Sequence, residues 1–212
     1  MAAELRLYMK RQLFYFLILL APMVADAQAP YERLGQKAMM SGDFSAAGAY
    51  FEKAWTANRE NTNALYLMGY AYYHAPNYRK SIDAFDKLIQ IKPTEAAAYY
   101  YRGKAKTLMF QQIKDIRSPE KGKLLTEAIK DFSTGIELSP DDMKFYQNRG
   151  LAYQEYGFYR SQKVTNIYNK KTAVAAANAS IQDLQKVLSE NGARRDIALQ
   201  IQKSKQLLED IR

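Results

Sequence analysis

Residues 65–93 read LYLMGYAYYHAPNYRKSIDAFDKLIQIKP and contain two apolar patterns with helical spacing. Apolar residues at intervals of three and four place one apolar stripe along each helix. Gly69 lies in the first pattern and Ser81 in the second, so each stripe carries a small residue where two helices can approach closely. Pro93 follows the second pattern, and proline cannot continue a helix. This stretch therefore predicts a closely packed pair of helices.

The frame around Gly69 recurs along the chain. Gly35, Gly69 and Gly103 are evenly spaced, and Gly150 follows Gly103 after a longer interval. Each glycine ends a similar motif, and the four motifs are Tyr31-x-x-Leu34-Gly35, Leu65-x-x-Met68-Gly69, Tyr99-x-x-Arg102-Gly103 and Tyr146-x-x-Arg149-Gly150. Self-similarity at a fixed period of about 34 residues indicates an array of stacked structural units.

The second half of each unit carries a small residue followed four positions later by Phe or Leu. The pairs are Ala47/Phe51, Ser81/Phe85, Ala128/Phe132 and Ser180/Leu184. Pro93 and Pro140 each follow the paired Phe by eight residues, and Gly192 takes the corresponding place in the fourth unit. The second helix comes later in the third unit than in the first two, and later still in the fourth. The additional residues therefore lie between the first and second helices.

These motifs resemble the tetratricopeptide repeat, whose pattern is W-x2-L-G-x2-Y, then A-x3-F, then P. The resemblance covers almost all of the chain after residue 27, although Arg59 stands where the first unit would have proline. It implies an all-α fold, a right-handed α-solenoid of about four helix pairs plus a C-terminal capping helix. The expected parts are units at about 28–61, 62–95, 96–142 and 143–194, and a capping helix over 195–212.

The two extended units have specific helix predictions. Ala96–Ile116 is expected to form one long helix, and Ser118-Pro119-Glu120 has the cap, proline and acid of a helix start. In the fourth unit we expect a helix from Tyr146 to about Tyr159. Both extensions leave the same edge of the array, so they should lie side by side.

A group of cations that we call the basic edge follows this last helix. Its members are Arg160, Lys163, Lys170 and Lys171, and no acid lies among them. One interpretation is a solvated basic loop. The other is a contact for an anionic surface, either phospholipid head groups or an acidic partner. Nucleic acid is not an expected partner, because the N-terminus predicts export.

The N-terminal segment 1–27 is typical of a signal peptide. Arg6, Lys10 and Arg11 precede the uncharged, mostly apolar run Leu13–Ala25, which is too short for a bilayer span of about 20 residues. Ala25-Asp26-Ala27 provides the small residues of a cleavage site. We expect an exported bacterial protein, periplasmic or secreted after cleavage behind Ala27. The alternative is an uncleaved N-terminal membrane anchor.

The composition excludes several kinds of chemistry. The 212 residues include no cysteine and one histidine, with 48% hydrophobic residues, 25% charged residues and a net charge of +9. Disulfide scaffolds, thiolate metal sites and cysteine nucleophiles are therefore ruled out. No phosphate loop, GxSxG, HExxH or calcium-loop motif is present. We expect no enzymatic activity, no cofactor and no metal site.

The family resemblance also implies a binding groove lined by the first helix of each unit. Its implied residues are Tyr66, Tyr70, Tyr73, His74, Tyr100, Lys104 and Gln147. The resemblance does not extend to the Lys, Asn and Arg cluster with which chaperone-binding members hold a terminal carboxylate. The expected function is to bind a protein or peptide partner, and the alternatives are glycan binding or, with the N-terminal segment retained, membrane-tethered assembly. Tyrosines also serve as packing residues in such repeats, as we expect for Tyr72 and Tyr99.

Overall fold

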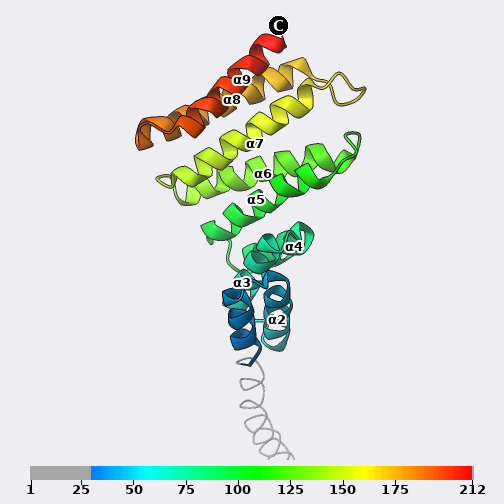
Figure 1. Ribbon diagram of the computed structural model, residues 1–212, viewed down its shortest axis with the longest axis vertical. Helices are drawn as coiled ribbons and strands as arrows, with labels where there is room; N and C mark the ends of the chain where they lie inside the picture. The colour runs from blue at the N-terminus through cyan, green and yellow to red at the C-terminus, as the bar shows by residue number, and fades with distance from the viewer. Residues whose placement is uncertain (1–29, 212) are drawn as a thin grey trace, which may run out of the picture. The chain divides into compact units, whose positions relative to one another are not determined.

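The computed structural model describes residues 30–211, and helices are the only regular secondary structure in that range (Figure 1). The predicted all-α helical-repeat fold is thereby confirmed. The chain divides after Asn77 into two compact units, and each is described by itself below. The predicted signal peptide lies outside the described residues. Within them, no helix is both long enough and apolar enough to cross a membrane.

Unit 1 consists of helical residues 30–40, α2 (Phe44–Ala57) and α3 (Thr62–His74). The side chain of Asp43 accepts a hydrogen bond from the Ala46 amide at the start of α2, and Asn61 caps α3 in the same way. Such caps satisfy amide groups that have no partner inside the helix. Because α2 packs against α3, the residues at which the two helices begin determine how the tyrosine-bearing face of α3 is oriented.

Unit 2 is a stack of six helices that lie side by side in chain order (Figure 1). They are α4 (Tyr78–Ile91), α5 (Ala96–Gln112), α6 (Pro119–Leu138), α7 (Met143–Ser161), α8 (Lys170–Asn191) and α9 (Arg195–Asp210). Ile197, Ile201 and Leu207 of α9 are buried, and α9 packs mainly on α8. An amphipathic last helix of this kind covers the apolar end of a repeat array.

The recurring glycines lie where paired helices approach most closely. A Cβ atom added to Gly103 would lie 2.8 Å from the ring of Phe132, and one added to Gly35 would lie 2.8 Å from the ring of Phe51. The small residues of the second helices, including Ala128, are fully buried. In the fourth unit, a Cβ atom on Gly150 would lie 2.9 Å from Leu184. The structure therefore confirms the glycine register, including the late second helix of the fourth unit.

The prediction that the long helix of the third unit would reach Ile116 is wrong. α5 ends at Gln112, four residues earlier. The buried ammonium of Lys121 donates hydrogen bonds to the carbonyl oxygens of Phe110 (3.0 Å) and Ile113 (2.5 Å). Burial lowers the pKa of Lys121, although nearby carboxylates partly oppose the shift. Carbonyl groups at the end of α5 thus find their partner on the next helix.

The two extensions form a core of their own. Phe110, Leu125, Tyr159 and Ile167 are buried in one apolar cluster, against which Val164 also packs. Phe110 of α5 and Leu125 of α6 flank the extension of the third unit, whereas Tyr159 at the end of α7 and Val164 and Ile167 belong to that of the fourth. The expectation that the extensions lie side by side is therefore correct. The cluster also explains why the long connections are ordered turns on lengthened helices.

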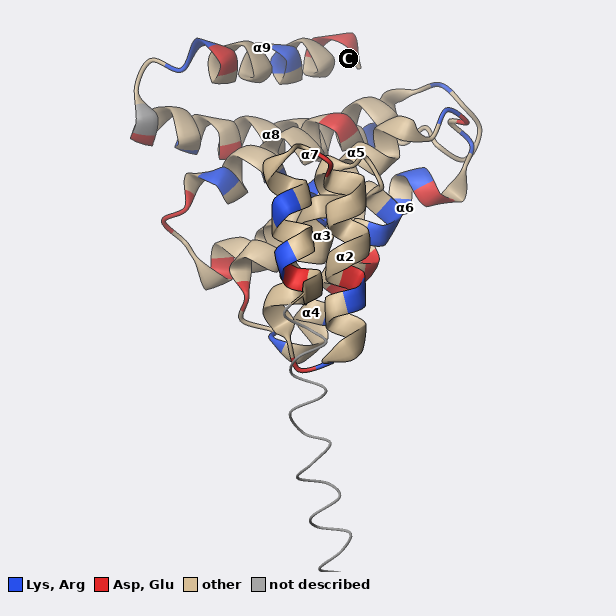
Figure 2. Cartoon of the chain, turned by 60° about the horizontal axis from the view of Figure 1, so that its bottom comes forward, with Lys and Arg blue, Asp and Glu red and all other residues tan. Residues whose placement is uncertain are grey.

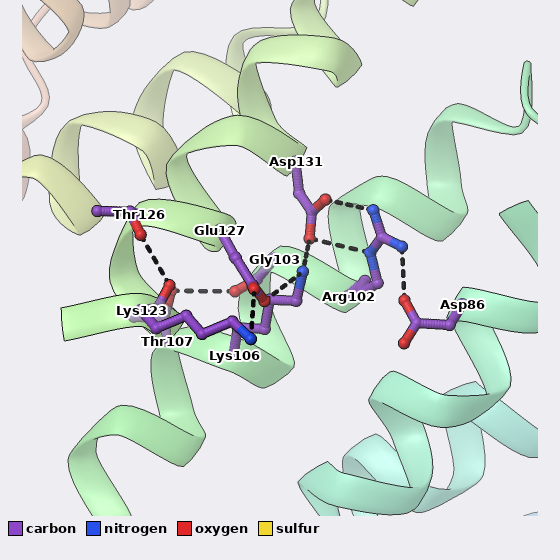
Figure 3. A network of polar contacts seen from close by, with 9 residues as sticks. All are labelled: Asp86, Arg102, Gly103, Lys106, Thr107, Lys123, Thr126, Glu127 and Asp131. Carbon is purple, nitrogen blue, oxygen red and sulfur yellow. Dashed lines mark hydrogen bonds and ion pairs between the residues drawn. The ribbon is translucent and has the colours of Figure 1, made fainter. Parts of the chain in front are cut away.

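Buried ion pairs join neighbouring helices in unit 2 (Figure 3). Arg102 of α5 donates through Nε to Asp131 of α6 (3.0 Å) and through Nη1 to Asp86 of α4 (2.6 Å). Lys106 Nζ also donates to Asp131 (2.9 Å), whose side chain is only 3% exposed. Burial alone would lower the pKa of Arg102, but the hydrogen bonds and charges of both aspartates outweigh it and raise the pKa. Arg102 therefore remains charged at any ordinary pH.

The next repeat contains an equivalent ion pair. Arg149 of α7 donates through Nε and Nη2 to Asp183 of α8, at 2.7 and 2.8 Å, and through Nη1 to Ser133 of α6 at 3.1 Å. The hydrogen bonds from Arg149 to Asp183 are the main cause that raises the pKa of Arg149. One arginine thus connects three successive helices, as Arg102 does in the preceding repeat.

Enlarging Gly103 should separate the helices that it brings together. We expect Gly103→Leu to lower the free energy of unfolding by about 2 kcal/mol or more, because the buried Phe132 ring has no room to move. The control is Ala175→Leu, at an exposed helix position, which should change stability by less than about 0.5 kcal/mol. Urea denaturation measures both, and equal effects would refute the glycine register.

Removing one partner of the Arg149–Asp183 pair should lower the free energy of unfolding more than replacing both partners does. Asp183→Ala leaves a half-buried arginine without its carboxylate and should lose about 3 kcal/mol of stability. The double variant Arg149→Met/Asp183→Ala introduces the residue types that Met68 and Ala84 supply in the second repeat, and it should recover much of that loss. Chemical denaturation of the three proteins tests this; a double variant less stable than Asp183→Ala would contradict it.

Candidate functional site

The predicted tyrosines of α3 form a continuous aromatic surface in unit 1. Tyr66, Tyr70 and His74 are spaced by four positions, which places them on one face of the helix. The ring centroids of Tyr66 and Tyr70 are 6.4 Å apart, those of Tyr70 and His74 are 4.4 Å apart, and the Tyr73 ring meets His74 edge-on at 5.0 Å. We call these four residues, with Phe44, the aromatic row.

Phe44 is a member of this surface that the sequence analysis missed. It is the first residue of α2, and its ring stacks on His74 with the centroids 5.0 Å apart. The family resemblance assigns the groove to the first helix of each unit, so it gave no reason to consider Phe44, which begins a second helix. The sequence did contain a signal for this position. Tyr78 begins α4 one repeat period after Phe44 begins α2, so an aromatic residue recurs at the start of the second helix.

The aromatic row is partly accessible, as a contact surface must be. Its three tyrosines and Phe44 are half-buried, and His74 is exposed. Burial, and secondarily the neighbouring Tyr70, raises the pKa of Tyr73, so its hydroxyl is neutral at physiological pH. Half-buried rings with neutral hydroxyl groups offer apolar faces together with hydrogen-bonding tips. Tyr72, by contrast, is only 4% exposed and donates to Glu52 at 2.7 Å, as expected for a packing residue.

The remaining predicted groove residues lie in unit 2. Tyr100 of α5 is half-buried and meets the rings of Phe132 and Phe145 edge-on, at 6.5 and 5.7 Å, so it packs on the core of that unit. Lys104 Nζ lies 5.3 Å from the centroid of the Tyr100 ring. Gln147 of α7 accepts a hydrogen bond from Arg194 at 3.4 Å. The single groove that would join these residues to the aromatic row stays a prediction.

The basic edge lies at the turn between α7 and α8. Lys163, Lys170 and Lys171 are exposed, and Arg160 is half-buried in the last turn of α7. The Arg160 carbonyl accepts a hydrogen bond from the Asn169 amide at 2.8 Å, which closes the loop between the helices. Lys and Arg positions gather on this side of unit 2 in Figure 2. The three lysines form an exposed cationic surface over this loop and the first turn of α8.

A hollow of about 510 Å³ lies beside the basic edge. Side chains of α7 and of the C-terminal end of α9, including the acid Asp210, line one part of it, and Lys163, Tyr168 and Lys170 line another. Among residues 30–211, no group of three or more His, Cys, Asp or Glu side chains is placed to hold a metal ion.

Comparisons with known proteins agree with this architecture. Residues 38–106 match the family model for the tetratricopeptide repeat. The solved structure of MamA protein shares 20% sequence identity, with a TM-score of 0.56, and the alignment covers 88% of this chain and 94% of that one. No curated protein sequence matches the chain.

Two further solved structures have the same fold. A thermophilic TPR protein of Thermus thermophilus is 16% identical, with 85% of this chain and 100% of that chain covered and a TM-score of 0.51. The second TPR domain of human RPAP3, in complex with an HSP70 peptide, is 20% identical, with 61% and 95% covered and a TM-score of 0.50. Residues 38–106 are thereby identified as tetratricopeptide repeats, and the solved structures show that the chain shares the helical-repeat fold of such proteins.

Proposed function

We propose that this protein is an exported, non-catalytic scaffold that binds a protein or peptide partner through its tyrosine-rich face. Tetratricopeptide repeats generally mediate interactions between proteins, and the RPAP3 domain is in complex with a peptide. The observation that carries the proposal is the aromatic row, in which five rings share one partly exposed surface of unit 1.

Physical properties of the aromatic row favour a peptide ligand. Tyrosine presents a large contact area with few rotatable bonds, so it loses little conformational entropy when a ligand binds. Its hydroxyl group can pair with the peptide backbone while the ring covers an apolar side chain. Tyr70 is central, because its ring neighbours both Tyr66 and His74. We therefore assign it the largest share of the binding energy.

Two alternative functions use the same features differently. In the first, the tyrosines stack on sugar rings and the ligand is an envelope glycan. In the second, the N-terminal segment is retained and the protein is a membrane-tethered assembly factor. The proposed site is the same in both, and the ligand class or the state of the N-terminus distinguishes them from our proposal.

Export predicts a defined mature N-terminus. The apolar run Leu13–Ala25 and the small residues Ala25 and Ala27 motivate cleavage after Ala27. Edman sequencing or intact-mass analysis of protein recovered from the envelope should identify Gln28 as the first residue. Recovery of membrane-bound protein that retains Met1 would contradict cleavage and support the anchor.

A photo-crosslinking amino acid at position 70 should capture the partner in the native envelope. The same reagent at Gln185, an exposed residue of α8, is the matched control. We expect a protein or peptide adduct at position 70 that is absent at position 185. A polysaccharide adduct would support the glycan alternative, and identical adducts at both positions would refute binding at the aromatic row.

Once the partner is known, two neighbouring tyrosines should separate binding from stability. Tyr70→Ala should weaken binding by about 1–2 kcal/mol, or roughly 5- to 30-fold in Kd, with little loss of fold. Tyr72→Ala should instead lower the melting temperature, because its buried ring packs against Gly48. Calorimetric titration and thermal melting provide the two measurements. Normal binding by Tyr70→Ala would remove the assigned anchor.

A further inference from the structure

The turns 113–118 and 162–169 together present one ordered surface. Their apolar residues, among them Ile116, Val164 and Ile167, pack into the core that the two extensions share. Asn166 has φ +66°, and the next two side chains differ in exposure: Ile167 is 4% exposed and Tyr168 is 47% exposed. The apolar residues thus hold the turns in place, while the charged residues and one tyrosine remain outside.

The exposed residues of this surface are predominantly cationic. From Tyr156 to Val174 the chain has four cations and no acid, and the neighbouring turn adds Lys114 and Arg117 with one acid, Asp115. No described carboxylate forms an ion pair with Lys163 or Lys171. We call this region the turn surface; it comprises Lys114, Arg117, Lys163, Tyr168, Lys170 and Lys171.

The turns at the opposite ends of the same helices carry little net charge. The turns 92–95 and 139–142 carry one lysine and three acids. At the α8–α9 turn, Arg194 is paired with Asp196 at 2.6 Å. The turns 113–118 and 162–169, with the start of α8, therefore carry more positive charge than the turns at the opposite end of the helix stack (Figure 2).

We propose that the turn surface docks on a bilayer that contains anionic phospholipids. Lysine is a compact, flexible point charge, which suits mobile phosphate groups that offer no fixed geometry. Tyrosine with an exposed polar tip is the side chain that concentrates at membrane–water interfaces. Cations within a Debye length of an anionic bilayer are attracted to it additively and in a salt-dependent way.

A bilayer fits these residues better than an acidic protein does. A carboxylate-rich protein interface favours arginine forks held in fixed positions. Here Lys163 lies on the turn and Lys170 and Lys171 begin α8, and all three are exposed. The proposal is independent of peptide binding, because the aromatic row belongs to unit 1 and the turn surface to unit 2. Tyr70→Ala should therefore leave bilayer docking unchanged.

The absence of cysteine allows a direct test. An environment-sensitive dye is attached to the full chain at Thr165→Cys, on the exposed turn, or at Thr94→Cys, at the opposite end of the helix stack. Phosphatidylglycerol vesicles should shift the emission of the dye at position 165 to the blue, whereas phosphatidylcholine vesicles should not. The dye at position 94 should respond to neither, whatever the N-terminal segment contributes to vesicle binding.

Two triple variants in the Thr165→Cys background test the assignment to particular residues. Replacing Lys163, Lys170 and Lys171 with Ser should raise the lipid concentration for half-maximal shift at least about tenfold. Replacing the exposed Lys92, Lys130 and Lys144 with Ser removes the same charge and should change it less than about threefold. Thermal melting checks that both variants remain folded.

Salt and a soluble polyanion complete the test. About 0.5 M NaCl should abolish the blue shift, because it shortens the Debye length to a few ångströms. Three results would each overturn the proposal. The first is no shift at position 165, the second is an equal shift with both lipids, and the third is an equal rise in the half-maximal lipid concentration in the two triple variants. A salt-sensitive shift with polyglutamate and none with phosphatidylglycerol would also overturn it and assign the surface to an acidic protein.

Discussion

The close approach of paired helices at glycine is the constraint on which the rest of this structure depends. A glycine of one helix lies against a Phe or Leu of the next, and a Cβ atom on Gly103 or Gly150 would lie within 3.0 Å of that side chain. This contact sets which residues of each helix face its partner. Once the register is set, the remaining residues are divided between core and surface, so the aromatic row is a consequence of the register.

Unit 2 has two structural features in addition to the glycine contacts. Its long connections form a separate apolar core, and Lys121 provides hydrogen bonds that the end of α5 would otherwise lack. Its arginines Arg102 and Arg149 occupy the position before the glycine, where the first two repeats have Leu34 and Met68. Buried ion pairs contribute little net stability, but an unpaired charge is costly, so they discriminate against misaligned helices.

Much of the fold could be predicted because the helix contacts need particular residue sizes at regular spacing. The end of α5 could not be predicted, because residues 111–116 contain no Gly or Pro. The helix ends where its carbonyl groups accept hydrogen bonds from Lys121, which belongs to another helix. The ion pairs also have a signal in the sequence, which would have allowed them to be predicted. Asp131 and Asp183 directly precede Phe132 and Leu184 only in the repeats that have arginine before the glycine.

The candidate site was less predictable than the fold. The spacing of Tyr66, Tyr70 and His74 placed them correctly on one face, because helical geometry alone decides that. Phe44 joins them through a tertiary contact between α2 and α3, and Tyr100 proves to pack on the core of unit 2. Sequence spacing assigns a residue to a helix face, whereas its neighbours on other helices determine its exposure.

A double-mutant cycle at Gly103 and Phe132 tests the glycine register most directly. Gly103→Ala should lower the free energy of unfolding by about 1–3 kcal/mol, because its Cβ atom meets the Phe132 ring. In the Phe132→Ala background the side chain that the new Cβ atom meets is gone, and the same substitution should cost at least about 1 kcal/mol less. Additive effects, within about 0.5 kcal/mol, would contradict the contact and the register that places every other residue.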